Sequence, residues 1–422
     1  MKNRFTVLGG IMSSVSDQTM QYITSMKEAE TKLTEFSHRF ATLIKDYDRN
    51  DVEVEIFDCA LPESSISSLK SSTTCQVSGS HELLIHGIRV HYKKKIPSVA
   101  PPLVLLHGYA NGALYYYRNI IGLSYYFSSV YSLDMMGWGL SSRPKFHLTD
   151  TSVEAAESFF VDSLEEWRKK NGIDKMILGG HSMGGYIAVA YCEKYPQHVE
   201  RLILLSPVGV PHKEKEEEAR IKRGMGNVSL KWKAVRYTFG KLWEWDFTPL
   251  VVSRVLSEER GRNLVSSYVQ RRLPAITSLE EQINLSEYLY LNSILPASGE
   301  NSLNRILLPG AFARNPLMDR IPKLTVSNPI TIVYGEKDWM DKTGGLEVKR
   351  ICVEQKKVES LKNKTENGKS CELIPDINVH IIKDAGHLLM LENWEEFNSS
   401  VIIAGMGVDS ISPNMPHPTV LK

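Results

Sequence analysis

Short apolar runs alternate with helix-length segments along most of the chain after residue 82. Each run is nearly continuous in Val, Ile and Leu, which is the pattern of strands that are covered on both faces of a sheet. Strands that alternate with helices predict an α/β fold, with a mostly parallel central sheet and helices on both of its faces. The predicted strands occupy residues 83–92, 102–106, 130–133, 175–178, 201–205, 330–334 and 379–382.

Three segments have the apolar spacing of helices. Residues 18–46 carry spaced Met, Ile, Leu and Phe among polar residues. Residues 155–170 place apolar side chains three or four positions apart, and residues 186–195 form an apolar run after a glycine-rich turn. We therefore predict a polar amino-terminal helix and two helices that pack on the sheet.

The alternation lapses between residues 207 and 328. This part opens with the charge run 213–218, which we interpret as a solvated helix face, and continues with several helical patterns. Its aromatic residues include Trp232, Phe239, Trp243 and Trp245. The simplest interpretation is a helical lid, or cap, inserted over the sheet.

The insertion divides the chain into parts. A helical extension covers residues 1–50, and the α/β core covers residues 51–206 and 329–405. The tail 406–422 carries three prolines and is expected to be flexible. Within the core, the polar segment 355–370 predicts a surface loop.

Charge and cysteine content narrow the class of protein. Lys and Arg number 50 against 49 Asp and Glu, so the usual electrostatic argument for binding nucleic acid is missing. The five cysteines are scattered and form no C-x-x-C pair, which predicts free thiols and disfavours a structural zinc site. No apolar run approaches the ~20 residues that a transmembrane helix needs. We expect any membrane contact to be peripheral.

The composition of the first residues bears on where in the cell the protein is located. Up to residue 26 the chain has Lys2, Arg4 and one acid, Asp17. The scarcity of acids is compatible with a mitochondrial transit peptide, although the Arg-rich pattern typical of one is missing. An ordinary frayed terminus is the alternative.

A candidate nucleophile lies in a glycine-rich turn between a predicted strand and a predicted helix. The sequence Gly180-His181-Ser182-Met183-Gly184 has the G-x-S-x-G pattern and the flanking elements of a nucleophile elbow. The glycines give room for a strained backbone at the serine, and the start of the helix stabilises developing negative charge. A glycine-rich turn with a spectator serine is the alternative.

A serine hydroxyl is a weak nucleophile near neutral pH, so the elbow requires an acid and a histidine base later in the chain. Asp338 and His387 each follow one of the last two predicted strands. Because active sites of parallel sheets assemble at the carboxyl ends of the strands, we assign Ser182, Asp338 and His387 as a catalytic triad. Asp341 is the competing acid, whereas Asp384 is interpreted as structural.

Acyl transfer also needs two backbone N–H groups that point at the oxyanion. The residue after the nucleophile, Met183, supplies one. We assign the other to Tyr109, in the loop after strand 102–106, with Gly108 allowing a close approach. The glycine-rich turn 134–142 is expected to shape the floor of the pocket.

The chain resembles the α/β-hydrolase fold family over residues 83–401. The motifs that carry the resemblance are HGY at 107–109, DMMGWGLS at 134–141, GHSMGG at 180–185, GEKDWM at 335–340 and AGH at 385–387. More narrowly, the GEKDWM run and the long amino-terminal extension are similar to the branch that contains the fungal mitochondrial cardiolipin-specific deacylase. That branch also holds N-acyl-phosphatidylethanolamine lipases and a lipid-droplet lipase co-activator.

This resemblance implies a serine hydrolase that deacylates phospholipids, cardiolipin first among them, at a membrane surface reached through the lid. It implies a peripheral position at the mitochondrial inner membrane, with the cytoplasm or a lipid droplet as alternatives. Neither a metal nor an organic cofactor is expected, and no obligate protein partner is evident. The co-activator lacks the nucleophile that Ser182 provides here, so we expect an active enzyme.

Other functions stay open at this point. Some members of the branch are credited with lysophosphatidic acid acyltransferase activity through an H-x-x-x-x-D pattern, but here His387 is followed by Glu392 at the last position. This pattern could equally cap the turn after the histidine. An N-acyl-phosphatidylethanolamine lipase and a soluble carboxylesterase are further enzyme alternatives, because a fold does not fix a substrate. A lipid-binding or lipase-regulating scaffold with a vestigial triad is the non-enzymatic one.

Overall fold

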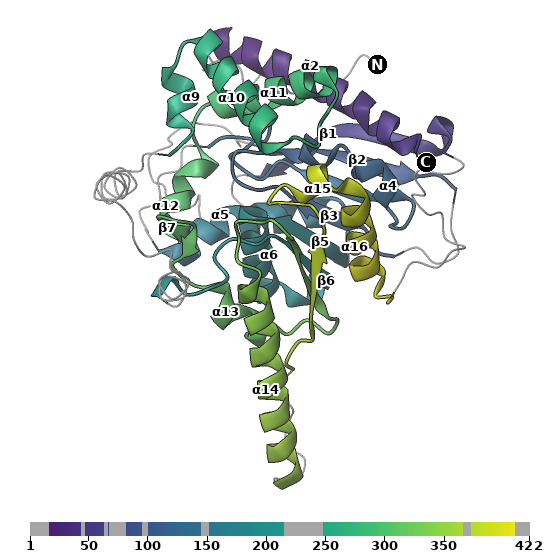
Figure 1. The fold of residues 1–422 in the computed structure, drawn as a ribbon, viewed down its shortest axis with the longest axis vertical. Helices are drawn as coiled ribbons and strands as arrows, with labels where there is room; N and C mark the ends of the chain where they lie inside the picture. Colours follow the sequence, from purple (N-terminus) through teal and green to yellow (C-terminus); the bar gives the residue numbers. More distant parts are fainter. Residues whose placement is uncertain are drawn as a thin grey trace.

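A sheet of eight strands forms the centre of the computed structural model (Figure 1). The structure describes residues 17–43, 47–62, 66, 82–94, 100–144, 152–214, 248–365 and 373–409. Its strands are β1 (Val52–Pro62), β2 (Glu82–Tyr92), β3 (Leu103–Leu106), β4 (Val130–Leu133), β5 (Met176–His181), β6 (Val199–Leu205), β9 (Ile330–Gly335) and β10 (Ile377–Ile382). Their order is β1-β2-β4-β3-β5-β6-β9-β10. Strand β2 runs antiparallel to its neighbours β1 and β4, and the other neighbouring pairs are parallel, so the sheet is mostly parallel, as predicted.

Helices cover the sheet and form the cap. The helices are α2 (Asp17–Ala41), α4 (Ile120–Ser124), α5 (Val153–Lys170), α6 (Met183–Lys194), α9 (Val251–Val255), α10 (Glu258–Arg272), α11 (Leu279–Ile294), α12 (Leu303–Ile306), α13 (Leu317–Arg320), α14 (Thr343–Thr365), α15 (Leu389–Glu392) and α16 (Trp394–Met406). Short 3-10 turns are η2 (Arg49–Asp51), η4 (Ala113–Tyr116), η5 (Pro196–His198), η6 (Gly299–Ser302) and η7 (Ile321–Lys323). A small antiparallel pair, β7 (Leu307–Leu308) and β8 (Phe312–Ala313), lies between α12 and α13.

Two apolar cores lie on the two faces of the sheet. Along β3, Val104 and Leu106 point into one core, whereas Leu103 and Leu105 point into the other, because successive side chains of a strand alternate between faces. The first core is covered by α5, α6 and the start of α14, and the second by α2, α4 and α16. The predicted layering, with helices on both faces, is confirmed.

The edge strand β1 was missed by the sequence interpretation. Val52, Val54 and Ile56 alternate with Glu53 and Glu55, which is the pattern of a strand with one solvated face. It pairs antiparallel with β2 along its full length.

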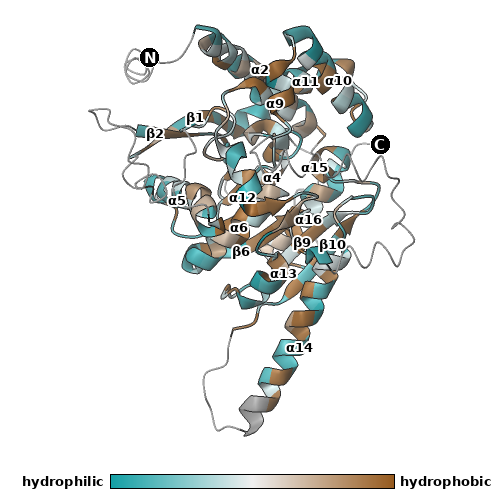
Figure 2. Cartoon of the chain, turned by 90° about the vertical axis from the view of Figure 1, so that its left-hand side faces the viewer, coloured by the Kyte–Doolittle hydropathy of each residue, from teal (hydrophilic) through white to brown (hydrophobic). Residues whose placement is uncertain are grey.

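The surface loop predicted at residues 355–370 is wrong for its first part. Helix α14 continues through this segment to Thr365. Lys, Glu, Gln and Leu are strong helix formers, and no glycine or proline interrupts them before Gly368. The outer length of α14 extends away from the rest of the molecule and carries both hydrophobic and hydrophilic residues (Figure 2).

The described part of the inserted segment is mostly helical. Helix α11 packs against α2, and α9 and α10 lie beside them (Figure 1). Arg39 of α2 forms an ion pair of 2.7 Å with Glu280 of α11, and Arg118 of the core donates to Glu281 at 2.8 Å. The four aromatic residues named for this segment and most of the charge run 213–218 lie outside the described residues.

The cysteines, the helices and the two ends of the chain bear on the remaining predictions. Cys59, Cys192 and Cys352 are free thiols, as predicted. Among the described residues, no helix combines the length and the apolar character needed to cross a bilayer. The start of the chain, where a transit peptide was considered, and most of the tail lie outside the described residues.

Candidate active site

Ser182 occupies a strained turn between β5 and α6. Its backbone has φ +54° and ψ −114°, a conformation that L-residues rarely adopt. A Cβ at Gly180 would lie 2.3 Å from the carbonyl oxygen of Gly184, and one at Gly184 would lie 2.6 Å from the carbonyl oxygens of Leu106 and His107. No larger residue fits at either position, which explains the glycines of the G-x-S-x-G pattern.

His387 and Asp338 lie together at the same edge of the sheet. Asp338 follows β9 and His387 follows β10, and Nδ1 of His387 is 3.1 Å from Oδ1 of Asp338. The other carboxylate oxygen, Oδ2, accepts the hydroxyl of Ser206 at 2.5 Å, and the N–H of Met340 donates to Oδ1 at 2.9 Å. Burial acts to raise the pKa of Asp338, but the hydrogen bonds from His387 and Ser206 outweigh it and hold this pKa below its ordinary value. Asp338 is therefore a buried carboxylate aimed at the imidazole.

The link between Ser182 and His387 runs through the residue before the serine. Nε2 of His181 lies 2.9 Å from the backbone oxygen of His387, and the two imidazole rings are 4.8 Å apart. Burial and the neighbouring His387 lower the pKa of His181 to about 3, so His181 is neutral and donates to that oxygen. In the part of the chain that the structure describes, no hydrogen bond joins the Ser182 hydroxyl directly to His387.

The competing acids have other partners. Asp341 accepts the N–H of Thr343 at 2.9 Å, at the start of α14. Asp384 is 80% exposed and forms an ion pair of 2.7 Å with Lys337. Asp338 is the acid that contacts the His387 ring.

Glu392 holds the loop that carries His387. Its Oε2 accepts the N–H of Gly386 at 2.7 Å, and its Oε1 accepts the N–H of Leu388 at 3.0 Å. The carboxylate thus fixes the backbone on both sides of the histidine. The interpretation of the H-x-x-x-x-E pattern as a structural cap fits this geometry.

The two predicted oxyanion donors lie next to the elbow. Met183 is the first residue of α6, so its N–H has no acceptor within the helix. A Cβ at Gly108 would lie 2.8 Å from Nδ1 of His181 and 3.1 Å from Cβ of Ser182, so the loop passes directly beside Ser182. Tyr109, the next residue, packs its ring against Trp138 of the turn 134–142, at 5.2 Å between centroids.

An apolar hollow lies beside the acid-bearing loop. It is open to solvent and is lined by Val210, Phe312 and Trp339 among others. The Trp339 ring is also 5.0 Å from the ring of His387. Trp339 therefore separates this hollow from the histidine.

Ser206 is the residue of the site that the sequence interpretation missed. It has φ +45°, is fully buried, and follows the last residue of β6. The sequence offered one indication of Ser206, which is its position at the end of a predicted strand, at the sheet edge where Asp338 and His387 also lie. A serine at a strand end is too common to stand out by itself.

Comparison with known proteins fits this geometry. The model of the alpha/beta hydrolase fold family matches residues 101–393. A 1-acylglycerol-3-phosphate O-acyltransferase of Arabidopsis thaliana is 35% identical over 310 residues, which cover 72% of this chain and 66% of that protein. The human 1-acylglycerol-3-phosphate O-acyltransferase ABHD5 is 32% identical over 71% of this chain and 76% of its own.

Solved structures share the fold at low sequence identity. A bacterial membrane phospholipase A has a TM-score of 0.51 and 19% identity, covering 90% of this chain and 92% of its own. The naproxen esterase of Bacillus subtilis also has a TM-score of 0.51, with 16% identity, covering 92% of this chain and 98% of its own. The relatives in sequence are named for chemistry on lipid acyl groups. With its elbow, its sheet and the family match over most of its length, this chain belongs to the α/β-hydrolase family.

Proposed function

We propose that this chain is a serine hydrolase that cleaves fatty acyl esters of phospholipids, releasing a lysolipid and a free fatty acid. One observation carries the proposal. A strained elbow presents Ser182 at the sheet edge where His387 lies against the buried carboxylate of Asp338. These are the residue types and relative positions of a nucleophile, a base and an orienting acid.

The reaction follows from these roles. The Ser182 hydroxyl attacks the ester carbonyl carbon while Nε2 of His387 accepts its proton, and Asp338 holds the Nδ1 proton and stabilises the imidazolium. The N–H groups of Met183 and Tyr109 donate to the oxyanion. The C–O bond to the lysolipid then breaks and His387 protonates the leaving oxygen. Water repeats the sequence on the acyl-enzyme and frees the fatty acid.

A lipid substrate is supported by two features. The relatives in sequence carry the names of acyltransferases that act on an acylglycerol phosphate. The hollow beside Trp339 is lined mainly by apolar residues, which suits an acyl chain better than a small polar ester. Among phospholipids we put cardiolipin first, because of the resemblance carried by residues 335–340.

We further propose that the lid contacts the membrane from its surface. Val255, Leu279 and Ile283 of the cap are 74%, 66% and 58% exposed, which is costly in water and favourable against acyl chains. The proposed location is the mitochondrial inner membrane, with the cytoplasm and lipid droplets as alternatives. Imaging a fluorescent fusion of the full chain distinguishes the three.

Acyl transfer to lysophosphatidic acid is the second candidate, favoured by the names of the plant and mammalian relatives. It is second because both oxygens of Glu392 are already engaged by the backbone around His387. The last residue of the H-x-x-x-x-E pattern is then a structural support for the loop that carries His387.

The test combines active-site labelling with product analysis. The full wild-type chain, Ser182→Ala and the matched control Ser360→Ala are treated with a fluorophosphonate. Each is then incubated with vesicles of cardiolipin, phosphatidylethanolamine, N-acyl-phosphatidylethanolamine and phosphatidylcholine. Parallel reactions contain lysophosphatidic acid with acyl-CoA, or a soluble short-chain ester.

We expect labelling and fatty-acid release in the wild type and in Ser360→Ala, and neither in Ser182→Ala. Cardiolipin should lose acyl chains faster than the other lipids. Near-normal release by Ser182→Ala would contradict the mechanism. Turnover confined to the soluble ester, or phosphatidic acid as the main product, would contradict the proposed substrate or the proposed reaction. An unlabelled, folded wild type would indicate a scaffold.

A further inference from the structure

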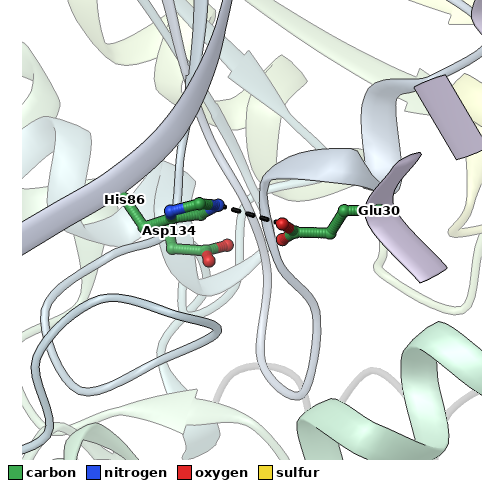
Figure 3. Close-up of side chains that lie close together, drawn as sticks. All are labelled: Glu30, His86 and Asp134. Carbon is green, nitrogen blue, oxygen red and sulfur yellow. Dashed lines mark hydrogen bonds and ion pairs between the residues drawn. The ribbon is translucent and has the colours of Figure 1, made fainter. Parts of the chain in front are cut away.

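A second polar cluster is buried where the amino-terminal helix meets the sheet. Glu30 comes from α2, His86 from β2, and Asp134 follows β4 (Figure 3). Glu30 and Asp134 are fully buried, and His86 is 2% exposed. The three residues are far apart in sequence, and the folding of α2 onto the sheet brings them together.

The side chains converge on one small space. One nitrogen or oxygen atom of each residue lies within 4.8 Å of one from each of the other two. Nε2 of His86 is 3.0 Å from Oε2 of Glu30. Asp134 is held in place because its Oδ1 accepts the N–H of Ala113 at 2.6 Å and its Oδ2 that of Leu140 at 2.7 Å.

A fourth residue orients the imidazole from outside the cluster. Nδ1 of His86 lies 2.7 Å from Oδ1 of Asp58 on β1, whose side chain is 39% exposed. With its proton on Nδ1, His86 turns Nε2 toward Glu30 and Asp134. When a histidine binds a metal through one ring nitrogen, the N–H of its other ring nitrogen commonly donates to a carboxylate in this way.

Glu30 supplies an independent sign that the cluster binds a ligand. Its Oε1 has no hydrogen-bond partner among the described residues, although the residue is fully buried. Figure 3 shows the Glu30 carboxylate facing His86 and Asp134. A buried carboxylate oxygen without a partner is costly, and a cation at this point would satisfy it.

The charge balance of the cluster agrees with the geometry. Three carboxylates, Glu30, Asp58 and Asp134, surround one imidazole. A divalent cation would balance this excess of carboxylates in a buried site.

We propose that Glu30, His86 and Asp134 bind a divalent transition-metal ion, with Zn²⁺ as the best match, and that Asp58 orients His86 from the second shell. One imidazole nitrogen and two carboxylates are a donor set that Zn²⁺ takes in proteins. Bonds of about 2.0–2.2 Å at tetrahedral angles place the ligand atoms about 3.3–3.6 Å apart, so atoms that lie within 4.8 Å of one another close in by up to about 1.5 Å when the metal binds. The metal takes the place of the proton on Nε2 of His86. It ties α2 to the sheet, apart from the chemistry at Ser182.

The first test measures metal in the protein as purified. The full chain, Glu30→Gln, Asp134→Asn and the control Glu281→Gln are analysed by inductively coupled plasma mass spectrometry. Glu281 is a matched control because it is also a buried glutamate, paired with Arg118 outside the cluster. We expect about one zinc per chain in the wild type and the control, and loss of it in the two ligand variants.

The second test uses the wild type and a change at a partly exposed position, so it does not depend on the buried variants folding. Protein treated with a chelator is titrated with Zn²⁺ alone, and binding is followed by calorimetry and by the melting temperature. We expect saturation at about one equivalent with a rise in melting temperature, and Asp58→Asn should weaken the affinity by about 10–100-fold. Absence of Zn²⁺ and Mn²⁺ binding in the wild type, or equal binding by a folded Glu30→Gln, would overturn the proposal.

Discussion

Removing the hydroxyl of Ser206 should slow the proposed hydrolysis by weakening the support of Asp338, the proposed catalytic acid. Ser206 donates to Oδ2 of Asp338 at 2.5 Å, and Oδ1 receives the other hydrogen bonds, from His387 and Met340. Ser206→Ala keeps the Cβ and therefore the strained backbone at φ +45°. The change thus removes one hydrogen bond with little effect on the fold.

The magnitude follows from the burial of this bond. The Asp338 side chain is 1% exposed, so water replaces the lost donor poorly. A hydrogen bond to a charged group contributes about 1.5–3 kcal/mol, and 1.4 kcal/mol corresponds to a factor of ten. If the imidazolium in the transition state loses this support in full, kcat falls by about 10–100-fold while KM changes little.

Stability at different pH values provides a second readout. The lowered pKa of Asp338 stabilises the fold above its unfolded pKa of about 3.9, and this contribution is lost as the pH falls through the lower folded value. Ser206→Ala should therefore have a smaller free energy of unfolding than the wild type at pH 7. The difference should shrink below about pH 4.

The assay is hydrolysis of a chromogenic ester between pH 5 and 9, with urea unfolding at pH 7 and at pH 3.5. The control is Ser163→Ala, which removes another buried hydroxyl whose acceptor is the backbone oxygen of Phe160 in α5. Activity of Ser206→Ala within twofold of the wild type, together with equal stability loss at both pH values, would refute the reasoning.

Three further changes test other parts of the site. Gly184→Ala puts a Cβ 2.6 Å from two backbone oxygens, so fluorophosphonate labelling should be lost and the melting temperature should fall; normal labelling would contradict the elbow geometry. Glu392→Gln can accept only one of the two N–H groups beside His387, so kcat should fall about tenfold with KM unchanged in steady-state kinetics. His181 is neutral when folded, with its pKa lowered to about 3, so acid favours the unfolded state. The wild type should therefore lose up to about 1.4 kcal/mol of unfolding free energy per pH unit below pH 6.5 in urea titrations, more steeply than His181→Gln.

Periodicity in the sequence accounts for most of the central sheet. The buried runs such as 102–106 and 330–334 are almost entirely apolar, and they correspond to β3 and β9. The prediction failed where a polar composition was interpreted as a loop although the residues favour a helix. Segment 355–370 is polar enough for a loop, but a chain of helix formers that starts from the packed end of α14 continues as a helix to Thr365.

The polar residues also divide into those that a local sequence pattern reveals and those whose role depends on a contact distant in sequence. Ser182 and His387 lie within local patterns with a recognisable backbone geometry, so their positions at the sheet edge could be predicted. Ser206 has no local pattern, because its role depends on a contact with Asp338 that is 132 residues away. Glu30 and His86 are likewise 56 residues apart and come from different elements. Such pairs become visible only when the elements are packed.

The docking of α2 on the sheet sets a limit on how far this chain can be shortened. Met26, Leu33 and Phe36 of α2 are between 0% and 4% exposed, and β1 and β2 form the edge of the sheet. The family match begins at residue 101, after all three of these elements. A shortened chain that starts there would uncover the apolar side chains beneath α2 and leave β4 as an open edge. Recombinant expression from that boundary should give aggregates, whereas a start ahead of α2 should give soluble monodisperse material.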